Sequence, residues 1–214
     1  MTYLELVNSV LKRLREDTVS SVTENKYSTM IGEFVNDIKE EVEEAHDWMR
    51  LRRTLQIVTS TGVFRYTLTG AGDRFRVISI FDDTNDNSLK QAPSQEWMNR
   101  MFNTGTQTNS HPGYYDFNGY SGDDTQMDMW PIPDGIYTIN CNFVIPQAKL
   151  SSNTDALIVP YQPVILGAYA KAVSERGEDG GISYQEADDA FHRSLNRVAS
   201  IDAYKFPNEQ EWYV

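Results

Sequence analysis

Three histidines and one cysteine are the side chains of this 214-residue sequence best suited to holding a metal ion or acting as a nucleophile. His46, His111 and His192 are far apart in the chain. None stands three or four residues from another histidine or cysteine, the spacing that places two metal ligands on one helix face. Cys141 lies in a strand-like stretch between two asparagines, with no adjacent base to activate it. The spacing therefore does not favour a metal site, and Cys141 is predicted to be a small buried side chain.

Paired carboxylates could supply general acid and base catalysis, and Glu40 and Glu44 have the spacing that places both on one helix face. Glu41 and Glu43 stand beside them, so we interpret the run as a solvated surface. The stretch GAGDRF from residue 70 has two glycines, but Phe75 stands where a dinucleotide-binding fingerprint needs its third glycine. We predict no catalytic, cofactor-binding or metal-binding residues, no cofactor, and a protein that is not an enzyme.

Aromatic residues that lie near carboxylates suggest one functional class, a carbohydrate-binding or carbohydrate-active protein. The residues concerned are Tyr114, Tyr115, Phe117, Tyr120 and Trp130, with Asp116, Asp123 and Asp124. The core of a β domain with polar loops would explain the same residues. Carbohydrate binding therefore stays the alternative function.

The balance of charges argues against several kinds of partner. With 19 Lys+Arg against 31 Asp+Glu, the formal net charge is −12, which repels phosphate backbones and anionic membrane surfaces. The single cysteine excludes an internal disulfide, and the start MTYLELVNSVLKRL is too polar for a signal peptide. The longest apolar stretch, around 163–170, is shorter than the roughly 20 residues that span a bilayer. We expect synthesis in the cytoplasm, no membrane segment and no sequence-specific binding of nucleic acid.

Apolar residues at helical spacing predict two helices near each end of the chain. The first begins with Thr2 and Glu5 in the form of a capping box, in which each side chain bonds the other residue's backbone N–H. The second has an apolar stripe and carries acidic residues over most of its remaining surface. The helical period returns twice in the last third of the chain, with a break at GEDGG, residues 177–181.

Between the two helix pairs, β-branched and aromatic residues predict strands. We also predict a short helix over 93–102 and polar, mobile loops over 103–113 and 118–126. Asp134 and Gly135 are a common hairpin-turn pair, and the stretches MDMWPIP and YTINCNFVIP that flank them predict a β-hairpin.

The order of these elements predicts the fold class α+β. Helices from opposite ends of the chain can cover one another only by packing together, which favours a four-helix bundle with an inserted antiparallel β domain. The expected segments are the N-terminal helix pair over 1–53, the β domain over 54–150, the C-terminal helix pair over 151–203, and an extended tail over 204–214.

The stretch WPIPDGIYTINCNFVIPQAKLSSNTDALIVPYQPVILGAYAKAVSERGED, residues 130–179, resembles proteins of the phage head-to-tail adaptor family. These are also called tail tubular protein A or gatekeeper proteins of short-tailed phages. The opening MTYLELVNSVLKRLRE, followed by a second, acidic helix, is similar to the start of such adaptors, whereas residues 70–128 carry no resemblance. The resemblance implies a structural virion protein that forms a twelvefold ring between the portal protein and the tail nozzle protein, with DNA in its bore.

Two sets of residues fit the role that the resemblance implies. A ring of exposed acids would let DNA pass without specific binding, because capture of phosphates needs Lys and Arg. The candidate channel-facing acids are Glu33, Asp37, Glu40, Glu41 and Glu44. The candidate portal-docking residues of the tail YKFPNEQEWYV are Tyr204, Phe206, Trp212 and Tyr213.

A single tail is expected to bind weakly. Ordering about ten residues costs roughly 1 to 2 kcal/mol each, which offsets most of the gain from burying the rings. A ring of tails binds together, because each docked subunit raises the effective concentration of the next tail. The alternative is that these rings cover the protein's own helices.

Overall fold

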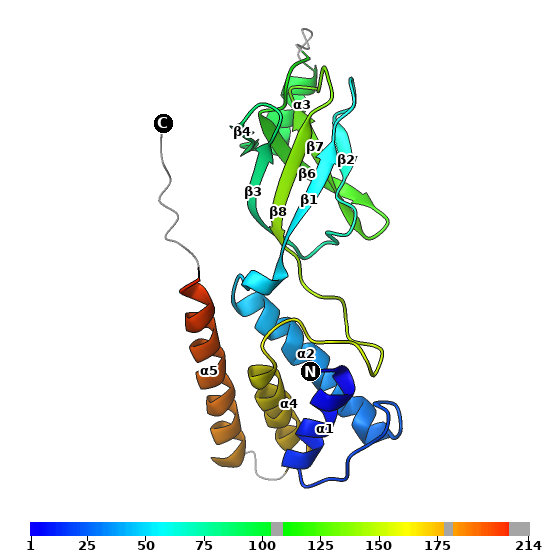
Figure 1. Cartoon of the computed structure of the whole chain (residues 1–214), viewed down its shortest axis with the longest axis vertical. Helices are drawn as coiled ribbons and strands as arrows, with labels where there is room; N and C mark the ends of the chain where they lie inside the picture. Colours follow the sequence, from blue (N-terminus) through cyan, green and yellow to red (C-terminus); the bar gives the residue numbers. More distant parts are fainter. Residues whose placement is uncertain (104–108, 178–181, 206–214) are drawn as a thin grey trace. The chain divides into compact units, whose positions relative to one another are not determined.

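The chain folds into two compact units, each with its own kind of secondary structure. The computed structural model describes residues 1–103, 109–177 and 182–205, without the side chains of residues 182 and 183. The helical unit comprises Met1–Leu51 and the chain from Gln147 onward, and the β unit comprises Arg52–Pro146 (Figure 1). The predicted α+β class is confirmed.

The helical unit is organised around one central helix. Its elements are α1 (Tyr3–Arg13), α2 (Lys26–Ala45), the short 3-10 helix η1 (Met49–Leu51), α4 (Tyr161–Glu175) and α5 (Ile182–Ala203). Helix α4 packs against α1, α2 and α5, and α1 also packs against α2. The middle of α4 is apolar on most of its sides, as expected for a helix that is covered by several others.

Close packing around α4 depends on Gly167. A Cβ atom at this position would lie 2.7 Å from Cγ2 of Ile38 on α2 and 3.1 Å from Cδ2 of Phe191 on α5. Both distances are shorter than ordinary van der Waals contacts. The hydrogen of Gly167 therefore lets three helices approach one another.

The helix starts are stabilised by their own side chains. The capping box predicted for α1 is confirmed, because Glu5 N–H donates to Thr2 Oγ1 (3.3 Å) and Thr2 N–H donates to Glu5 Oε2 (2.8 Å). Asn25 and Ser28 form the corresponding pair of bonds at the start of α2. Within the described part of the chain, no helix combines the length and the apolar character that crossing a membrane requires.

The β unit contains two four-stranded sheets and one helix. The first sheet has the order β1 (Arg52–Val58), β8 (Thr138–Val144), β3 (Arg76–Asp82) and β4 (Asn87–Ser88). The second has the order β2 (Arg65–Thr67), β7 (Asp124–Trp130), β6 (Tyr114–Ser121) and β5 (Lys90–Gln91). Strands β5 and β6 run parallel, and the other neighbouring pairs are antiparallel. Helix α3 (Gln95–Asn103) confirms the short helix predicted over 93–102.

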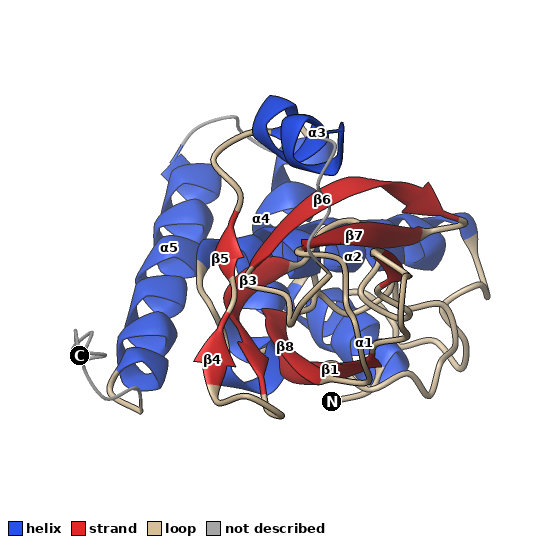
Figure 2. Cartoon of the chain, turned by 90° about the horizontal axis from the view of Figure 1, so that it is seen from above, coloured by secondary structure: helices blue, strands red, loops and turns tan. Residues whose placement is uncertain are grey.

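The two sheets share one hydrophobic core. Seen from above, β6 and β7 lie on one side of the β unit and β1 and β8 on the other (Figure 2). Ile80 and Phe143 from the first sheet and Met127 and Met129 from the second belong to the same buried cluster. The unit is therefore a small sandwich in which inward-facing side chains of both sheets interdigitate.

The hairpin predicted around Asp134 and Gly135 is wrong. Strand β7 pairs with β2 and β6, whereas β8 pairs with β1 and β3, so the chain crosses from one sheet to the other between them. Thr59 Oγ1 donates to Gly135 O (3.0 Å), and Gly62 N–H donates to Pro133 O (2.9 Å). These long-range bonds hold the crossing connection, and a local turn signal cannot reveal them.

The polar loop predicted over 118–126 is also wrong. These residues form the closed end of the β6–β7 hairpin, in which Tyr120 pairs with Thr125 and Ser121 with Asp124. Gly122 takes the left-handed conformation that the turn requires, with φ 65°. Of the other predicted loop, 103–113, residues 104–108 lie outside the described part of the chain.

Candidate functional site

The five acids predicted to face a channel lie along α2, where their spacing places them on one side of the helix. We call Glu33, Asp37, Glu40, Glu41 and Glu44 the acidic stripe. Four of its members are exposed, and Glu40 is half-buried. Two members form ion pairs with lysines, because Asp37 Oδ2 lies 3.2 Å from Lys171 Nζ and Glu40 Oε1 lies 3.9 Å from Lys149 Nζ. The stripe is therefore an acidic surface whose negative charge is partly neutralised by two lysines of the helical unit.

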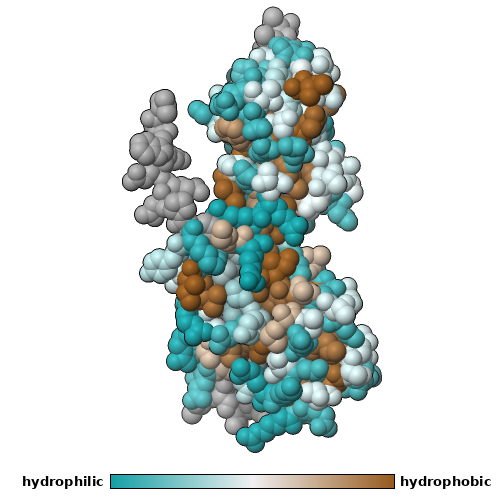
Figure 3. Space-filling view, in the orientation of Figure 1, coloured by the Kyte–Doolittle hydropathy of each residue, from teal (hydrophilic) through white to brown (hydrophobic). Residues whose placement is uncertain are grey.

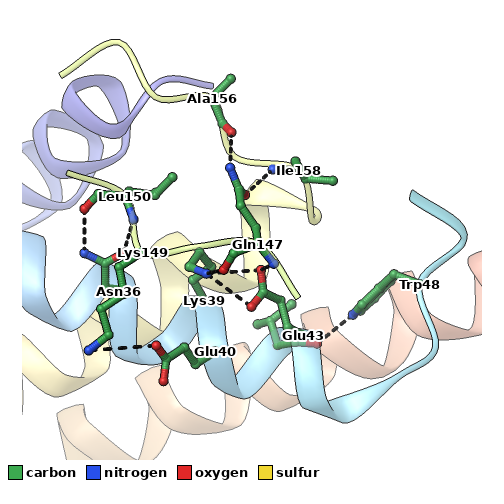
Figure 4. Close-up of polar contacts among 11 residues, drawn as sticks. Asn36, Lys39, Glu40, Glu43, Trp48, Gln147, Lys149, Leu150, Ala156 and Ile158 are labelled. Carbon is green, nitrogen blue, oxygen red and sulfur yellow. Dashed lines mark hydrogen bonds and ion pairs between the residues drawn. The ribbon is translucent and has the colours of Figure 1, made fainter. Parts of the chain in front are cut away.

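Glu43 does not belong to this solvated surface, contrary to the interpretation of the run Glu40–Glu44. Its carboxylate is buried and lies 3.2 Å from the equally buried ammonium group of Lys39, one helical turn earlier (Figure 4). The two residues continue the i, i+4 spacing of Val35, which faces the core. That spacing is the sequence signal that could have identified the pair.

Gln147 completes the hydrogen bonding of this ion pair. Lys39 Nζ donates to Gln147 O (2.6 Å), and Gln147 N–H donates to Glu43 Oε1 (3.2 Å). The Gln147 side chain in turn donates to Ala156 O (2.7 Å) and accepts from Ile158 N–H (3.0 Å) (Figure 4). The hydrogen bonds that the buried charges of Lys39 and Glu43 need are thus supplied by a chain segment more than 100 residues away in the sequence.

Asn36 makes a second connection between α2 and the same segment. Its side chain donates to Leu150 O (3.0 Å) and accepts from Leu150 N–H (2.9 Å), as a backbone strand would. Together with Gln147, this contact fixes the path by which the chain enters the helical unit. We call Asn36, Lys39, Glu43 and Gln147 the buried polar network.

The end of α5 is held by a carboxylate. Asp202 accepts hydrogen bonds from Met49 N–H (2.9 Å) and Lys205 Nζ (2.9 Å), and it lies 3.5 Å from His46 Nε2. Burial would raise the pKa of Asp202, but these donors and charges hold it below its ordinary value. The last residues of the described chain are therefore tied to the loop that follows α2.

The predicted docking residues of the tail are placed only in part. Tyr204 is 89% exposed. Phe206, Trp212 and Tyr213 lie outside the residues that the structure describes.

Cys141 is buried in the core of the β unit, as predicted. Burial raises the pKa of its thiol to about 12, so the nucleophilic thiolate is strongly disfavoured. His46 lies against Trp48, His111 beside Ser110, and His192 near Asp188. Among the described residues, no cluster of three or more histidine, cysteine or acidic side chains could hold a metal ion.

The structure divides the aromatic residues that suggested carbohydrate binding. Tyr115 is buried in the core, and Phe117 packs against it. Tyr114 and Trp130 instead pack against Trp97 in tilted and edge-to-face arrangements, with ring centroids 5.0 and 5.4 Å from the Trp97 ring.

The carboxylates near these rings also have structural contacts. Asp124 accepts hydrogen bonds from the backbone N–H groups of Gly70 (2.9 Å) and Gly72 (3.1 Å). Burial raises the pKa of Asp116, which is paired in the strand register with Asp128. Tyr120 is 63% exposed and Asp123 is also exposed, so the rings and acids of this set are divided between the core and the surface.

Comparison with known proteins gives one match that covers nearly the whole chain. The family model described as SU10 adaptor protein matches residues 1–211. Among solved structures, a chain from the "Neck of empty GTA particle computed with C6 symmetry" is similar over 82% of this chain and 80% of its own, at 14% identity. The TM-score of this match is 0.29. No curated protein sequence matches.

Proposed function

The chain belongs to the SU10 adaptor family, and on this premise we propose that it forms a ring that joins the portal protein of a phage to its tail nozzle protein. The observation that carries the proposal is the match of the adaptor family's model to residues 1–211. In this role the protein is a structural component of the virion, made in the host cytoplasm and without enzymatic activity. We propose a twelvefold ring, with the genome in its bore.

The helical unit supplies the rigid part of this proposed ring. We propose that α1, α2, α4 and α5 act as a four-helix bundle and that the β unit is an insertion between its two halves. The buried polar network supports this arrangement, because it attaches the chain that returns from the β unit to α2 through Gln147 and Leu150. The end of the chain that leaves the inserted unit would then be fixed independently of the loops of that unit.

The acidic stripe is proposed to face the DNA channel. Exposed carboxylates repel phosphates, and a ring multiplies the charge of each chain, so that DNA slides without being held. Exposure of Glu33, Asp37, Glu41 and Glu44 supports this role, since a buried acid could not act on DNA. The pairing of Asp37 with Lys171 lowers the repulsion between acids that follow one another on the helix.

The tail from Tyr204 to Val214 is proposed to dock on the portal. Tyr204 already extends into solvent, and Pro207 cannot continue the helix, so the aromatic residues beyond it can serve as anchors. Trp212 is the largest of these anchors, and tryptophan is enriched among interface hot spots. A weak contact of one tail becomes a firm joint when it is repeated around a ring.

A nonsense mutation in the gene of the phage that encodes the chain tests this function. We expect particles whose heads assemble but carry no tail, and we expect the full-length chain supplied in trans to restore tail attachment. Electron microscopy of purified particles gives the result directly. Tailed particles of normal infectivity, formed without the chain, would contradict an adaptor role.

A further inference from the structure

A groove opens in the helical unit beside the last described residue. It lies between the start of α4, the end of α5 and the loop around η1, and has a volume of about 310 Å³. The residues that line it and matter here are Trp48, Arg50, Tyr161, Ile201, Asp202 and Lys205. A groove of this size lies at the lower end of the range for ligand pockets and has room for one large side chain.

The rim of the groove is apolar and exposed. Tyr161 is 53% and Ile201 57% exposed, although both are large hydrophobic residues, whereas Trp48 is buried. Apolar surface is visible near the C-terminal end of α5 (Figure 3). Exposed apolar surface around a hollow is typical of a surface that another group covers.

The charges at the groove are predominantly basic. Arg50 is exposed and donates to Ile158 O at 3.4 Å, and Lys205 pairs with Asp202. Asp202 is engaged by the backbone of Met49 as well, so its charge is already compensated. An apolar ring that is followed or preceded by carboxylates would therefore fit the groove better than a basic group.

The chain itself supplies a segment with this chemistry. Residues 206–214 read FPNEQEWYV, with three aromatic residues, two glutamates and no lysine or arginine. The segment begins directly after Lys205, which lines the groove. Nine residues reach up to about 30 Å when extended, and the Pro207–Asn208 pair favours a turn, so the segment can return to the groove.

We propose that the groove binds the chain's own C-terminal segment in the unassembled protein, with Trp212 as the ring that enters it. Glu209 and Glu211 then lie near Arg50 and Lys205. The short tether gives the segment an effective concentration in the millimolar range, which a separate chain at working concentration does not reach. Trp212 is thereby kept from other surfaces until a competing partner is present.

This device regulates the tail proposed above, and its effect on assembly rests on that proposed function. A portal must displace the segment from the groove before it can bind the tail. The apparent affinity of the chain for the portal is therefore the intrinsic affinity multiplied by the fraction of chains whose tail is free. Weakening the groove without changing the tail should therefore strengthen portal binding. Binding of the segment in the isolated chain is independent of any portal.

Disulfide trapping in the isolated chain tests the proposal. Tyr161→Cys at the rim is combined with Tyr213→Cys beside the proposed anchor, and Cys141 does not interfere because it is buried. The matched control replaces Tyr161→Cys by Arg193→Cys, which is exposed on α5 and within reach of the segment but does not line the groove. We expect the first pair to form an intramolecular disulfide at least tenfold faster than the control pair, as read by non-reducing electrophoresis.

Each other outcome overturns the proposal in a defined way. Equal rates for the two pairs would show that the segment does not prefer the groove. Disulfide-linked dimers whose yield rises with protein concentration would assign the groove to the tail of a second copy.

Hydrogen exchange adds a readout without cysteines. The backbone amides of residues 208–214 should exchange at least tenfold more slowly in the native chain than in Ile201→Glu, and equal exchange would contradict the proposal. Because no portal is present, failure here leaves the adaptor role untouched.

Discussion

Lys39 Nζ lies 3.2 Å from Glu43 Oε2 on successive turns of α2, and both side chains are completely shielded from solvent. Burial of two charges carries a desolvation cost that their mutual attraction offsets only when their remaining hydrogen-bonding capacity is satisfied. Gln147 satisfies it here with one donor and one acceptor of its backbone. The pair therefore ties the fold of α2 to the point at which the chain returns to the helical unit.

Lys39→Met should destabilise the protein by about 3 to 5 kcal/mol, because it leaves the carboxylate of Glu43 buried without its counter-charge. The double variant Lys39→Met/Glu43→Met should be more stable than Lys39→Met. It should not regain the native value, since the backbone of Gln147 then loses its partners. Urea unfolding of the native chain and of the two variants measures these differences.

The exposed pair Glu96 and Arg100 is the matched control, because it has the same spacing in α3. Glu96→Ala should change the free energy of unfolding by less than about 1 kcal/mol. A similar small loss for Lys39→Met would show that the buried pair does not hold the helical unit together.

Gly167→Ala should destabilise the protein by about 1 to 3 kcal/mol, since the added methyl group overlaps Ile38 and Phe191. Gly113→Ala is the control, because a Cβ atom at Gly113 meets nothing within 4 Å. Thermal unfolding measures the melting temperatures of both variants against that of the native chain. An unchanged melting temperature for Gly167→Ala would mean that the three helices do not pack as described.

Asp202 should contribute to the pH dependence of stability. Its pKa is lowered in the folded chain, so its contribution is fully present above the unfolded value of about 3.9 and is lost as the pH falls through the folded value. The difference in unfolding free energy between the native chain and Asp202→Asn should therefore be largest near pH 6 and shrink below about pH 4. A difference that stays constant to pH 2.5 would exclude this role.

Charge reversal of the acidic stripe should make the wall of the proposed channel bind DNA. In particles that carry Glu33→Lys, Glu41→Lys and Glu44→Lys together, release of DNA should slow, and added salt should restore it because phosphate contacts are screened. The same number of reversals on exposed acids of the β unit, Asp73→Lys, Asp83→Lys and Asp123→Lys, controls for net charge. Equal rates of DNA release in the two sets of variants would contradict the proposal that the acidic stripe faces the channel.

Local signals in the sequence predicted the helices well. Thr2 and Glu5 are three residues apart, and the capping box that they form needs no distant partner. Helix α3 was likewise predicted from its own residues, because helical hydrogen bonds join neighbours in the sequence.

Long-range pairing could not be predicted in the same way. Strand β8 pairs with β1, whose paired residues are 80 to 92 positions away, so the turn signal at Asp134 and Gly135 predicts a hairpin that the chain does not form. Glu43 looked like one more surface acid because Gln147, which buries and satisfies it, is 104 residues distant. In both cases the missing information was the partner, which no local pattern contains.

The most direct test of the account is to mix the purified chain with the portal ring of its own phage and to examine the product by electron microscopy and by mass. We expect the chain alone to be a monomer of 24.5 kDa and to add to the portal as a closed ring of about twelve copies. A chain that stops after Lys205 should remain folded and fail to add. A full-length chain that leaves the portal unchanged, or a truncated chain that still forms the ring on it, would contradict the account.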